Sequence, residues 1–501
     1  MPSRPNILLI TSDQQHWRML GVHTPGLKTP HLDRLAAQGT RFERAYCPNP
    51  TCTPTRSSLI TGLYPSQHGA YTLGSRLPEN ISTLGQYLQD AGYDCTLIGK
   101  AHFQPLRGTE EFPSLEAFPT LQDLDFWRSF HGPFYGFNHI ELARNHADEA
   151  HVGQHYAIWM EENGAKEWRN WFQPPTGTTP AQRHRWNIPE KFHYNTWIAE
   201  RTIARMEQVR HAPFFLWASY FDPHPPYLVP EPWDTMYDPA QIELPVQGLD
   251  DIRRWPELMR RTQIAGSSFD EWEEPDGHII HGLGHHRIDP DALRKDVAVY
   301  YGMTSMLDHY IGKILTRLDE LGLAENTLVL FTSDHGHYFG QHGLTAKGPF
   351  HFEDGLRVPM IVRWHDRVPA GRVSHALQSL VDFAPSLLAV ADLPVPGNMS
   401  GKNQLPIWQG DETGARTGVS IEFRHQPTKL NLRTYIDTRY KLTVWNHPPD
   451  GELYDLEADP GENHNLWSDP DAGELKTKLL QKALLMEMEK EPYRMPRLAV
   501  A

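Results

Sequence analysis

The fold is decided by the stretch NILLITSDQ, residues 6–14 of the 501-residue chain. After Asn6, its first half is wholly apolar and partly β-branched, which is typical of a parallel strand buried on both faces. The apolar run stops at Thr11, so Asp13 and Gln14 stand just beyond the strand's carboxyl end. The stretch therefore predicts a buried strand that carries an acid and an amide out of a sheet.

The same pattern, an apolar strand followed by polar residues, occurs three more times. The further segments are CTLIGKAH (95–102), FFLWASYFDPHPP (214–226) and TLVLFTSDHG (327–336). Helical patterns lie between the strands, for example at 30–38 and 84–91, each ending before a glycine. Strands that alternate with helices predict a mostly parallel sheet covered on both faces, with ligands bound at the carboxyl ends of its strands. We therefore expect all four polar segments to meet in one region.

Single polar residues at strand ends have an ordinary explanation. An Asp after a strand is more often a helix cap or turn residue than a metal ligand, and a His near prolines usually lies on the surface. These segments, however, place acidic, imidazole and cationic side chains together at equivalent edges of one sheet. Helix caps do not explain such a set, so it indicates a catalytic or metal-binding site.

The segment CTPTR, residues 52–56, has the pattern of a helix entrance, and Gly62 is the predicted end of that helix. Proline is favoured in a first helical turn, and this end of a helix has free N–H groups and partial positive charge. Cys52 is then either an anionic nucleophile or a small buried apolar residue, and its position alone does not decide between the two. The polar strand ends favour the nucleophile.

The composition limits the classes of protein to consider. With 39% hydrophobic and 22% charged residues the chain is globular, and its length predicts one large domain with a smaller one appended. We place a catalytic domain at 1–395, with a loop-rich insertion at about 105–195 and a loop at about 240–295, and a C-terminal subdomain at 396–501. A formal net charge of -15 argues against nucleic acid and against an anionic membrane as partners.

The cysteines and the N-terminus bear on location. Cys47, Cys52 and Cys95 are the only cysteines, which gives no disulfide framework and fits a reducing compartment. The N-terminus runs directly into the first strand, which leaves no room for a signal peptide, and no apolar run reaches membrane-spanning length. We therefore expect a cytoplasmic protein.

Two stretches are less regular. Residues 105–195 lack a clean period and hold five tryptophans, so we expect an insertion that packs a small core of its own. From residue 396 onward, short strands at 418–423 and 440–445 precede a helix from Glu474 to about Lys490. The apolar stripe of this helix is too broad for a solvated helix, so we expect it to dock on its own chain or to form the interface of a homo-oligomer.

Four motifs, in this order, resemble signatures of the type I sulfatases and of the related phosphonate monoester hydrolases, in the alkaline phosphatase superfamily. The resemblance covers close to the whole chain. It implies that Cys52 is oxidised after translation to formylglycine. The motifs are Cys52-x-Pro54-x-Arg56; Gly99-Lys100-x-His102; Thr332 to Gly336 with Gly340-x-His342-Gly343 and Lys347-Gly348; and Glu452 to Leu456 with Asp459 to Asn463 and Asn465-Leu466.

The resemblance implies an α/β fold of the alkaline phosphatase and sulfatase type. A large, mostly parallel mixed sheet would be sandwiched by helices, and a smaller C-terminal α+β subdomain would be built on a short antiparallel sheet. One divalent metal would be held mostly by oxygen donors, as Ca²⁺ prefers, with an imidazole that also suits Mn²⁺, and Mg²⁺ is a further alternative. The implied ligands are Asp13, Gln14, Asp334, His335 and the formylglycine made from Cys52.

The resemblance also implies the roles around the nucleophile. One hydroxyl of the hydrated aldehyde at position 52 would attack sulfur or phosphorus in line. Arg56, one helical turn further on, would fix this group and share its charge. His102 would deprotonate the second hydroxyl, so that sulfate leaves and the aldehyde forms again.

A second set of implied residues would bind the ester group. Lys100 would bridge the nucleophile and a sulfate oxygen, while His224 and Lys347 would contact the ester oxygens, one of them protonating the leaving group. His193 is a further candidate for substrate binding.

The main hypothesis is a sulfuric ester hydrolase that acts on a small-molecule or saccharide sulfate ester, and it requires a formylglycine-generating enzyme during maturation. A phosphonate monoester or phosphodiester hydrolase with the same nucleophile is the alternative, because Gln14 and His335 resemble that branch where many sulfatases have Asp and Asn. The alternative of another class is a non-catalytic binder of sulfated ligands in which Cys52 stays unconverted.

Overall fold

The structure is a computed structural model, and most of the chain is described. The described residues are 4–144, 152–172, 184–249, 252–273, 282–284, 288–425, 430–447 and 449–491. Parts of the predicted insertion at about 105–195 and of the predicted loop at about 240–295 therefore lie outside the described residues, and so do the four histidines of that loop, His278, His281, His285 and His286. None of the helices in the described ranges combines the length and the apolar character needed to cross a bilayer.

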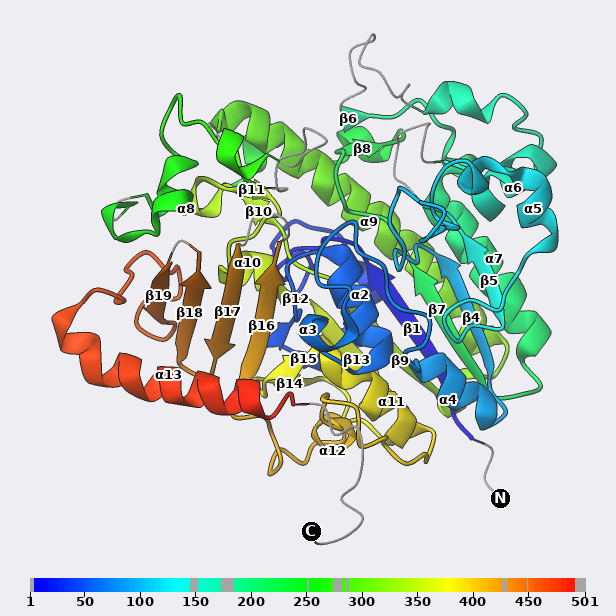
Figure 1. The fold of residues 1–501 in the computed structure, drawn as a ribbon. Coiled ribbons are helices and arrows are strands. Elements are labelled where there is room, and N and C mark those ends of the chain that lie inside the picture. Colours follow the sequence, from blue (N-terminus) through cyan, green and yellow to red (C-terminus); the bar gives the residue numbers. More distant parts are fainter. Residues whose placement is uncertain are drawn as a thin grey trace, which may run out of the picture.

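The largest sheet within the described residues has eight strands, in the order β14-β2-β13-β9-β1-β7-β4-β5 (Figure 1). The four strands predicted from the sequence are its neighbouring central members, and they run parallel, while β13 is antiparallel to both of its neighbours. The strands are β1 (Asn6–Ser12), β2 (Thr40–Phe42), β4 (Asp94–Gly99), β5 (His139–Leu142), β7 (Phe214–Ser219), β9 (Thr327–Ser333), β13 (Met360–Arg363) and β14 (Arg372–Ser374). This is the predicted mostly parallel mixed sheet.

Strand β1 is buried on both faces, as its apolar run predicts. Ile7 and Leu9 point into one hydrophobic core, whereas Leu8 and Ile10 point into another, because successive side chains of a strand alternate between faces. The parallel register places Ser12 beside Ser333 of β9. Asp13 and Asp334, the next residue of each strand, therefore leave the sheet at the same level.

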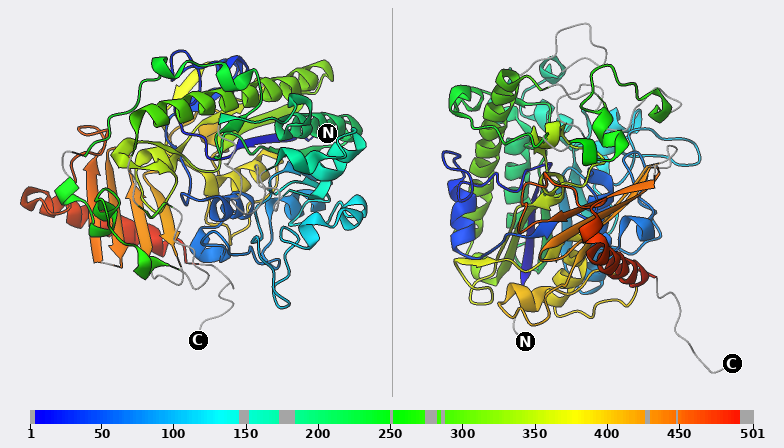
Figure 2. Two further views of the ribbon diagram at one scale, coloured as in Figure 1. Left: turned by 90° about the horizontal axis from the view of Figure 1, so that it is seen from above. Right: turned by 90° about the vertical axis from the view of Figure 1, so that its left-hand side faces the viewer.

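Helices cover both faces of the sheet, and the three layers can be followed in Figures 1 and 2. One core joins the sheet to α2, α4 and α11, and the other joins it to α1, α6, α7 and α9. These helices are α1 (Pro30–Ala37), α2 (Cys52–Thr61), α4 (Leu84–Asp90), α6 (Gln154–Glu162), α7 (Tyr194–Val209), α9 (Pro290–Glu320) and α11 (Phe383–Val390). Short helices are α3 (Pro65–His68), α5 (Leu124–Ser129), α8 (Glu257–Arg261), α10 (Glu353–Leu356) and α12 (Leu405–Trp408).

The described part of residues 105–195 does not pack a core of its own, so that expectation was wrong. Their strand β5 pairs with β4 and extends the main sheet. Their aromatic side chains are therefore drawn onto the two faces of that sheet: Trp127 joins the core that contains Ile7, whereas Trp159 joins the core that contains Leu8. The insertion thus enlarges the main domain at one edge of the sheet.

The C-terminal region holds the predicted antiparallel sheet, and Figure 1 shows α13 lying across it. Its elements are β16 (Val419–Arg424), β17 (Asn431–Ile436), β18 (Tyr440–Asn446), β19 (Pro449–Asp455) and α13 (Gly473–Met488). Leu479 packs against the sheet, but Leu484, Leu485 and Met488 are 61%, 54% and 55% exposed. Docking on this chain therefore accounts for only part of the broad apolar stripe.

Shorter pairings complete the fold. The strands β3 (Ala45–Tyr46), β12 (Arg357–Val358) and β15 (Gln378–Ser379) form one small sheet. Two-stranded pairs are formed by β10 (Tyr338–Phe339) with β11 (Thr345–Ala346) and by β6 (His184–Arg185) with β8 (Leu228–Val229). The C-terminal sheet contacts the main domain next to α2, since the backbone N–H of Glu422 donates to the carbonyl oxygen of Pro48 at 2.8 Å.

Candidate active site

Helix α2 presents Cys52 at its first position, as the sequence predicts. The residue before it, Thr51, makes no side-chain cap, so N–H groups of the first turn are left for other partners. Pro54 lies in this first turn, and the helix ends at Gly62, whose φ of 67° is the left-handed conformation that glycine adopts without strain. All ten residues of the helix are buried. Cys52 is therefore held rigidly at a protected helix entrance.

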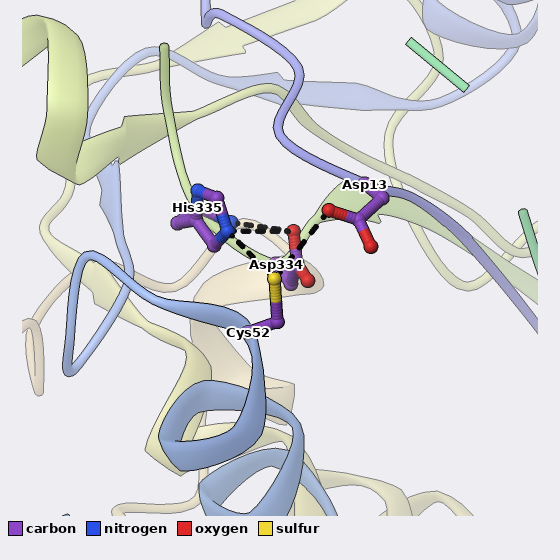
Figure 3. A group of neighbouring side chains, drawn as sticks. All are labelled: Asp13, Cys52, Asp334 and His335. Atoms are coloured by element: carbon purple, nitrogen blue, oxygen red, sulfur yellow. Dashed lines mark hydrogen bonds and ion pairs between the residues drawn. The ribbon is translucent and has the colours of Figure 1, made fainter. Parts of the chain in front are cut away.

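The side chain of Cys52 lies against residues from two strand ends (Figure 3). Its Sγ is 3.1 Å from Nε2 of His335 and 3.6 Å from Oδ1 of Asp13. One potential ligand atom each from Asp13, Cys52, Asp334 and His335 lies within 4.8 Å of the others, and all four residues are buried. The structure thus brings together four of the five predicted metal ligands.

Two lysines surround the same sulfur atom. Nζ of Lys347 is 3.2 Å from Sγ of Cys52 and 2.8 Å from Nε2 of His224, and Nζ of Lys100 is 3.9 Å from Sγ. Burial and the charge of Asp13 would raise the pKa of the Cys52 thiol, but Lys100 and Lys347 outweigh them and lower it. The site therefore stabilises negative charge at position 52, as an anionic nucleophile or a bound oxyanion requires.

Arg56 ties the strand ends together beneath the nucleophile. Its guanidinium donates to Oδ2 of Asp334 at 2.9 Å and to Oδ2 of Asp13 at 3.3 Å. It also donates to the backbone oxygen of Lys100 at 3.0 Å and to Oγ of Ser219 at 2.7 Å. One side chain thus links β1, β4, β7 and β9. Burial alone would raise the pKa of Asp13, but the surrounding cations, Lys100 first, hold it well below the usual value.

Gln14 is the fifth predicted ligand, and it lies beside the four-residue cluster. Its backbone has a φ of 57°, and its N–H donates to Oδ1 of Asp334 at 3.0 Å. Its Nε2 is 2.9 Å from Nδ1 of His337. Its buried Oε1 has no hydrogen-bond partner among the described residues. An unpaired buried amide oxygen is costly, so a ligand at this point would satisfy it.

The donor set fits a hard divalent cation. Asp13 and Asp334 supply carboxylate oxygens, Gln14 supplies the unpaired amide oxygen, and His335 supplies an imidazole nitrogen. Mostly oxygen ligands suit Ca²⁺ or Mg²⁺, and a single imidazole is also compatible with Mn²⁺. The residues present therefore match the predicted metal site, and the donor types do not select one ion.

His102 lies on the loop that follows β4. Its φ is 61°, and its buried Nδ1 has no hydrogen-bond partner among the described residues. Burial, together with the charges of Arg144, Lys100 and Arg56, keeps the pKa of His102 well below its usual value, so the ring is neutral and able to accept a proton. No direct hydrogen bond joins it to Cys52 in the described part of the chain.

Glu116 clamps this loop, and the sequence did not predict it. Its carboxylate accepts the backbone N–H groups of His102, Phe103 and Gln104 at 3.1, 3.0 and 3.2 Å. The same carboxylate forms a buried ion pair with Arg144, the second residue after β5. Both residues fall in the stretch without a clean period, where neither a motif nor spacing marks them.

His193 is the one candidate that the structure places away from the cluster. It is fully buried and caps α7, with Nδ1 accepting the backbone N–H of Asn195 at 3.2 Å. Its ring packs on Tyr194 and Trp186. Burial lowers the pKa of His193 to about 3. In this conformation the side chain is covered by its own protein, and its buried Nε2 has no hydrogen-bond partner among the described residues, so a role in substrate binding stays a prediction.

Comparison with known proteins gives a consistent result. A family profile described as Sulfatase matches residues 5–393, and one described as N-sulphoglucosamine sulphohydrolase, C-terminal, matches residues 340–491. The uncharacterized sulfatase YidJ of Escherichia coli is 31% identical over 506 residues, covering 98% of this chain and 89% of that protein. The N-acetylglucosamine-6-O-sulfatase of Bacteroides thetaiotaomicron is 25% identical over 526 residues, covering 97% and 87%.

Among solved structures, the phosphonate monoester hydrolase of Agrobacterium radiobacter superimposes with a TM-score of 0.79 at 27% identity, covering 97% of this chain and 96% of that one. Because the sulfatase profile spans most of its length, this chain belongs to the sulfatase family, in the alkaline phosphatase superfamily. It is thus an enzyme of the sulfatase class, a hydrolase of sulfate esters.

Proposed function

We propose that this enzyme removes sulfate from a sulfated carbohydrate, using formylglycine made from Cys52 and one divalent cation, Ca²⁺ in the first instance. The observation that carries the proposal is the cluster of Asp13, Cys52, Asp334 and His335 at the entrance of α2. A saccharide substrate is supported by the likeness to an N-acetylglucosamine-6-O-sulfatase over 97% of the chain.

The charges around position 52 suit a sulfate ester. Such an ester presents a central atom shielded by oxygens that carry negative charge, so its cleavage needs fixed positive charge close to those oxygens. Lys100 and Lys347 both lie within 4 Å of Sγ of Cys52, with Nζ to Sγ distances of 3.9 and 3.2 Å. They would receive the sulfate group as it approaches the nucleophile.

The divalent cation, when bound, would acidify a hydroxyl of the formylglycine hydrate and neutralise negative charge on the ester. The chain's own residues do the rest. Arg56 holds Asp13 and Asp334 in place. His224, beside Lys347, would protonate the departing alcohol, and the neutral ring of His102 would accept the proton whose loss releases sulfate.

A phosphonate monoester or phosphodiester hydrolase is the second candidate. Gln14 and His335 favour it, as does the superposition on the phosphonate monoester hydrolase of Agrobacterium radiobacter. The N–H of Gln14 bonds Asp334, and His335 Nε2 lies at the nucleophile, so both residues belong to the site whichever ester is cleaved. The third expectation, a non-catalytic binder of sulfated ligands in which Cys52 stays unconverted, gains no support from the match to the sulfatase family.

Matched aryl sulfate and aryl phosphonate esters will separate the two hydrolases. We expect the larger kcat/KM with the sulfate, and a large preference for the phosphonate would reverse the proposal. Peptide mass spectrometry around position 52, after expression with a formylglycine-generating enzyme, should show the aldehyde. An unconverted cysteine with ligand binding and no turnover would favour the binder.

A matched pair of variants tests the nucleophile itself. Cys52→Ala should abolish turnover, because alanine cannot be oxidised to formylglycine and offers no nucleophile. Cys95→Ala serves as the control, since Cys95 lies in β4 and its thiol bonds the backbone oxygen of Gly85 at 3.5 Å. Loss of activity in both variants would indicate a general effect of removing a buried thiol.

Several narrower expectations belong to the same proposal. They are the cytoplasmic location, the choice of Ca²⁺, the maturation enzyme as a partner, the homo-oligomer and the domain boundary between residues 395 and 396. A panel of sulfated monosaccharides and oligosaccharides, assayed for sulfate release, would identify the sugar and the ring position.

A further inference from the structure

A buried chain of hydrogen bonds leads away from Gln14. Its Nε2 is 2.9 Å from Nδ1 of His337, and Nε2 of the same imidazole is 3.0 Å from the hydroxyl of Tyr227. His337 is fully buried, and its ring packs on Tyr300 and Phe339, with ring centres 5.0 and 4.6 Å apart. The imidazole is therefore held between two polar partners and cannot turn to a third.

The Gln14 backbone is fixed as firmly as its side chain. The hydroxyl of Tyr300 donates to the carbonyl oxygen of Gln14 at 2.7 Å and accepts the N–H of His16 at 3.0 Å. Together with the bond to Asp334, this contact holds the residue in its left-handed conformation. Only the amide orientation remains to be determined by the surroundings.

The two tautomers of a neutral His337 correspond to two orientations of that amide. With the proton on Nε2, the ring donates to Tyr227 and accepts the Gln14 NH₂ group on Nδ1. The amide oxygen then points the other way, where Oε1 is buried with no partner among the described residues. With the proton on Nδ1, the amide would reverse and turn its NH₂ group toward the four-residue cluster. An NH₂ group repels a cation, whereas an amide oxygen binds it.

We propose that Tyr227 and His337 are positioning residues that select the amide orientation in which Gln14 offers oxygen to the metal ion. The inference rests on the proposed function, since it assumes that a divalent cation binds between Asp13, Asp334 and His335. Tyr227 accepts the Nε2 proton of His337, which leaves Nδ1 as an acceptor and holds the Gln14 NH₂ group away from the cation. The Gln14 amide can thus serve in place of a carboxylate ligand, because its oxygen is kept facing the metal ion.

The test measures metal binding directly, by titrating Mn²⁺ into the full-length chelator-treated protein and following free Mn²⁺ by electron paramagnetic resonance. Tyr227→Phe removes only the hydroxyl and leaves a buried Nε2–H without its acceptor, which weakens the selected tautomer. Removing a residue that orients a metal ligand through hydrogen bonds typically lowers metal affinity by about 10–100-fold. We therefore expect the Mn²⁺ dissociation constant to rise about 10-fold.

Tyr220→Phe is the matched control. Its hydroxyl is also buried but has no hydrogen-bond partner among the described residues, so the same atom is removed without touching the relay. The control should leave the dissociation constant unchanged. Thermal midpoints measured in chelator will show whether either variant perturbs the fold without metal.

The same Tyr227→Phe change, made in a Gln14→Glu protein, tests whether Tyr227 acts through the Gln14 amide. In Gln14→Glu either carboxylate oxygen can face the cation, so orientation no longer depends on His337. Adding Tyr227→Phe to Gln14→Glu should then change the dissociation constant less than about 2-fold, against about 10-fold in the native background. This loss of coupling is not expected if Tyr227 supports the site by packing alone.

The outcomes separate this inference from the proposed function. A native protein that binds neither Mn²⁺ nor Ca²⁺ would overturn both. Binding by the native protein with an unchanged constant in Tyr227→Phe would overturn the relay while leaving the metal site intact. Equal effects of Tyr227→Phe in both backgrounds would likewise overturn it, because the amide would then not be the group that Tyr227 orients.

Discussion

Glu116 shows how one residue outside every motif can control a motif residue. Its carboxylate accepts three consecutive backbone N–H groups of the loop that carries His102, and its ion pair with Arg144 keeps it in place. These hydrogen bonds help to hold His102 at its left-handed φ of 61°. The orientation of the proposed base is therefore set by an acid that never needs to meet the substrate.

Replacing Glu116 by Gln should slow the step that releases sulfate more than the step that releases the alcohol. The single amide oxygen of Gln cannot accept all three hydrogen bonds that the two carboxylate oxygens of Glu116 accept from the loop. The variant also leaves Arg144 without its negatively charged partner. We expect kcat to fall about 10–100-fold, less than the roughly 10²–10⁴-fold that a general base typically contributes, because His102 itself is retained. Rapid-quench assays with an aryl sulfate should show a burst of the aryl alcohol followed by slow turnover.

Equal slowing of both steps, without a burst, would contradict a specific effect on His102. Arg144→Lys is the companion variant, because it keeps the positive charge beside Glu116 while changing the geometry of the pair. A smaller effect there than in Glu116→Gln would show that the bonds to the loop matter more than the ion pair.

The residues that could be predicted are those whose neighbours in the sequence carry the signal. Asp13 and Asp334 directly follow apolar strands, and Cys52 and Arg56 share one helical turn, so local patterns point to them. The roles of Tyr227 and Glu116, and the burial of His193, result from contacts between segments that lie far apart in the sequence. A short-range pattern has no access to such contacts.

At the scale of elements, β5 lies at the edge of the main sheet and is joined to α7 by an ion pair. Glu141 in β5 accepts two hydrogen bonds from Arg201 of α7, at 2.6 and 3.0 Å, and its side chain is 7% exposed. Burial would raise the pKa of Glu141, but hydrogen bonds from His139 and Arg201 lower it from 4.5 to about 2. The strand is thus anchored to the helix layer by a carboxylate that stays charged.

This anchor predicts a specific acid sensitivity. A carboxyl whose pKa is lower in the folded state stabilises the fold above its unfolded pKa of 4.5, and that contribution is lost as the pH falls toward about 2. Glu141→Gln should therefore cost about 2 kcal/mol at pH 7, and the difference from the native protein should shrink below pH 4.5. Urea unfolding at pH 7 and at steps down to 3.5 will measure it; a constant difference would refute the assignment.

Element prediction succeeded where one face of an element differs from the other, or where a strand is uniformly apolar. The four central strands, α1 and α4 fall in this group, whereas α2 was predicted from Pro54 in its first turn and Gly62 at its end, and α13 from its broad apolar stripe. The 31-residue helix α9 was not predicted, because residues on all sides of its middle part are buried, among them Tyr300, Ser305 and Asp308. In this middle part polar and apolar residues share the buried faces, which makes the helical pattern harder to see in the sequence.

At the scale of the whole molecule, a buried charge cluster joins the C-terminal sheet to the main domain. Lys441 of β18 forms an ion pair with Glu462 and lies 3.9 Å from Glu353 of α10. Glu353 in turn accepts the hydroxyl of Tyr46 at 2.9 Å, and its backbone N–H donates to Glu462 at 2.7 Å. Glu462 belongs to the motif that resembles the family's C-terminal signature, so this motif helps to hold the C-terminal sheet against the main domain.

Lys441→Met should be strongly destabilising, because it leaves two carboxylates buried without their cation, a loss of about 3–5 kcal/mol. Adding Glu462→Gln should recover part of that loss, since it removes one of the unpaired charges. The free energies of unfolding of the native protein, both single variants and the double variant complete the cycle. Strictly additive effects would mean that the two residues do not act as one unit.

The complete burial of Cys52 has a consequence for the order of events in the life of the protein. The residue is 0% exposed and is enclosed by side chains that lie as far apart in the sequence as Asp13 and Lys347. These segments meet only when the chain has folded. An enzyme that converts Cys52 to formylglycine, as we propose, would therefore have to reach it while residues 52–56 are still an extended peptide, so that this oxidation would come before folding.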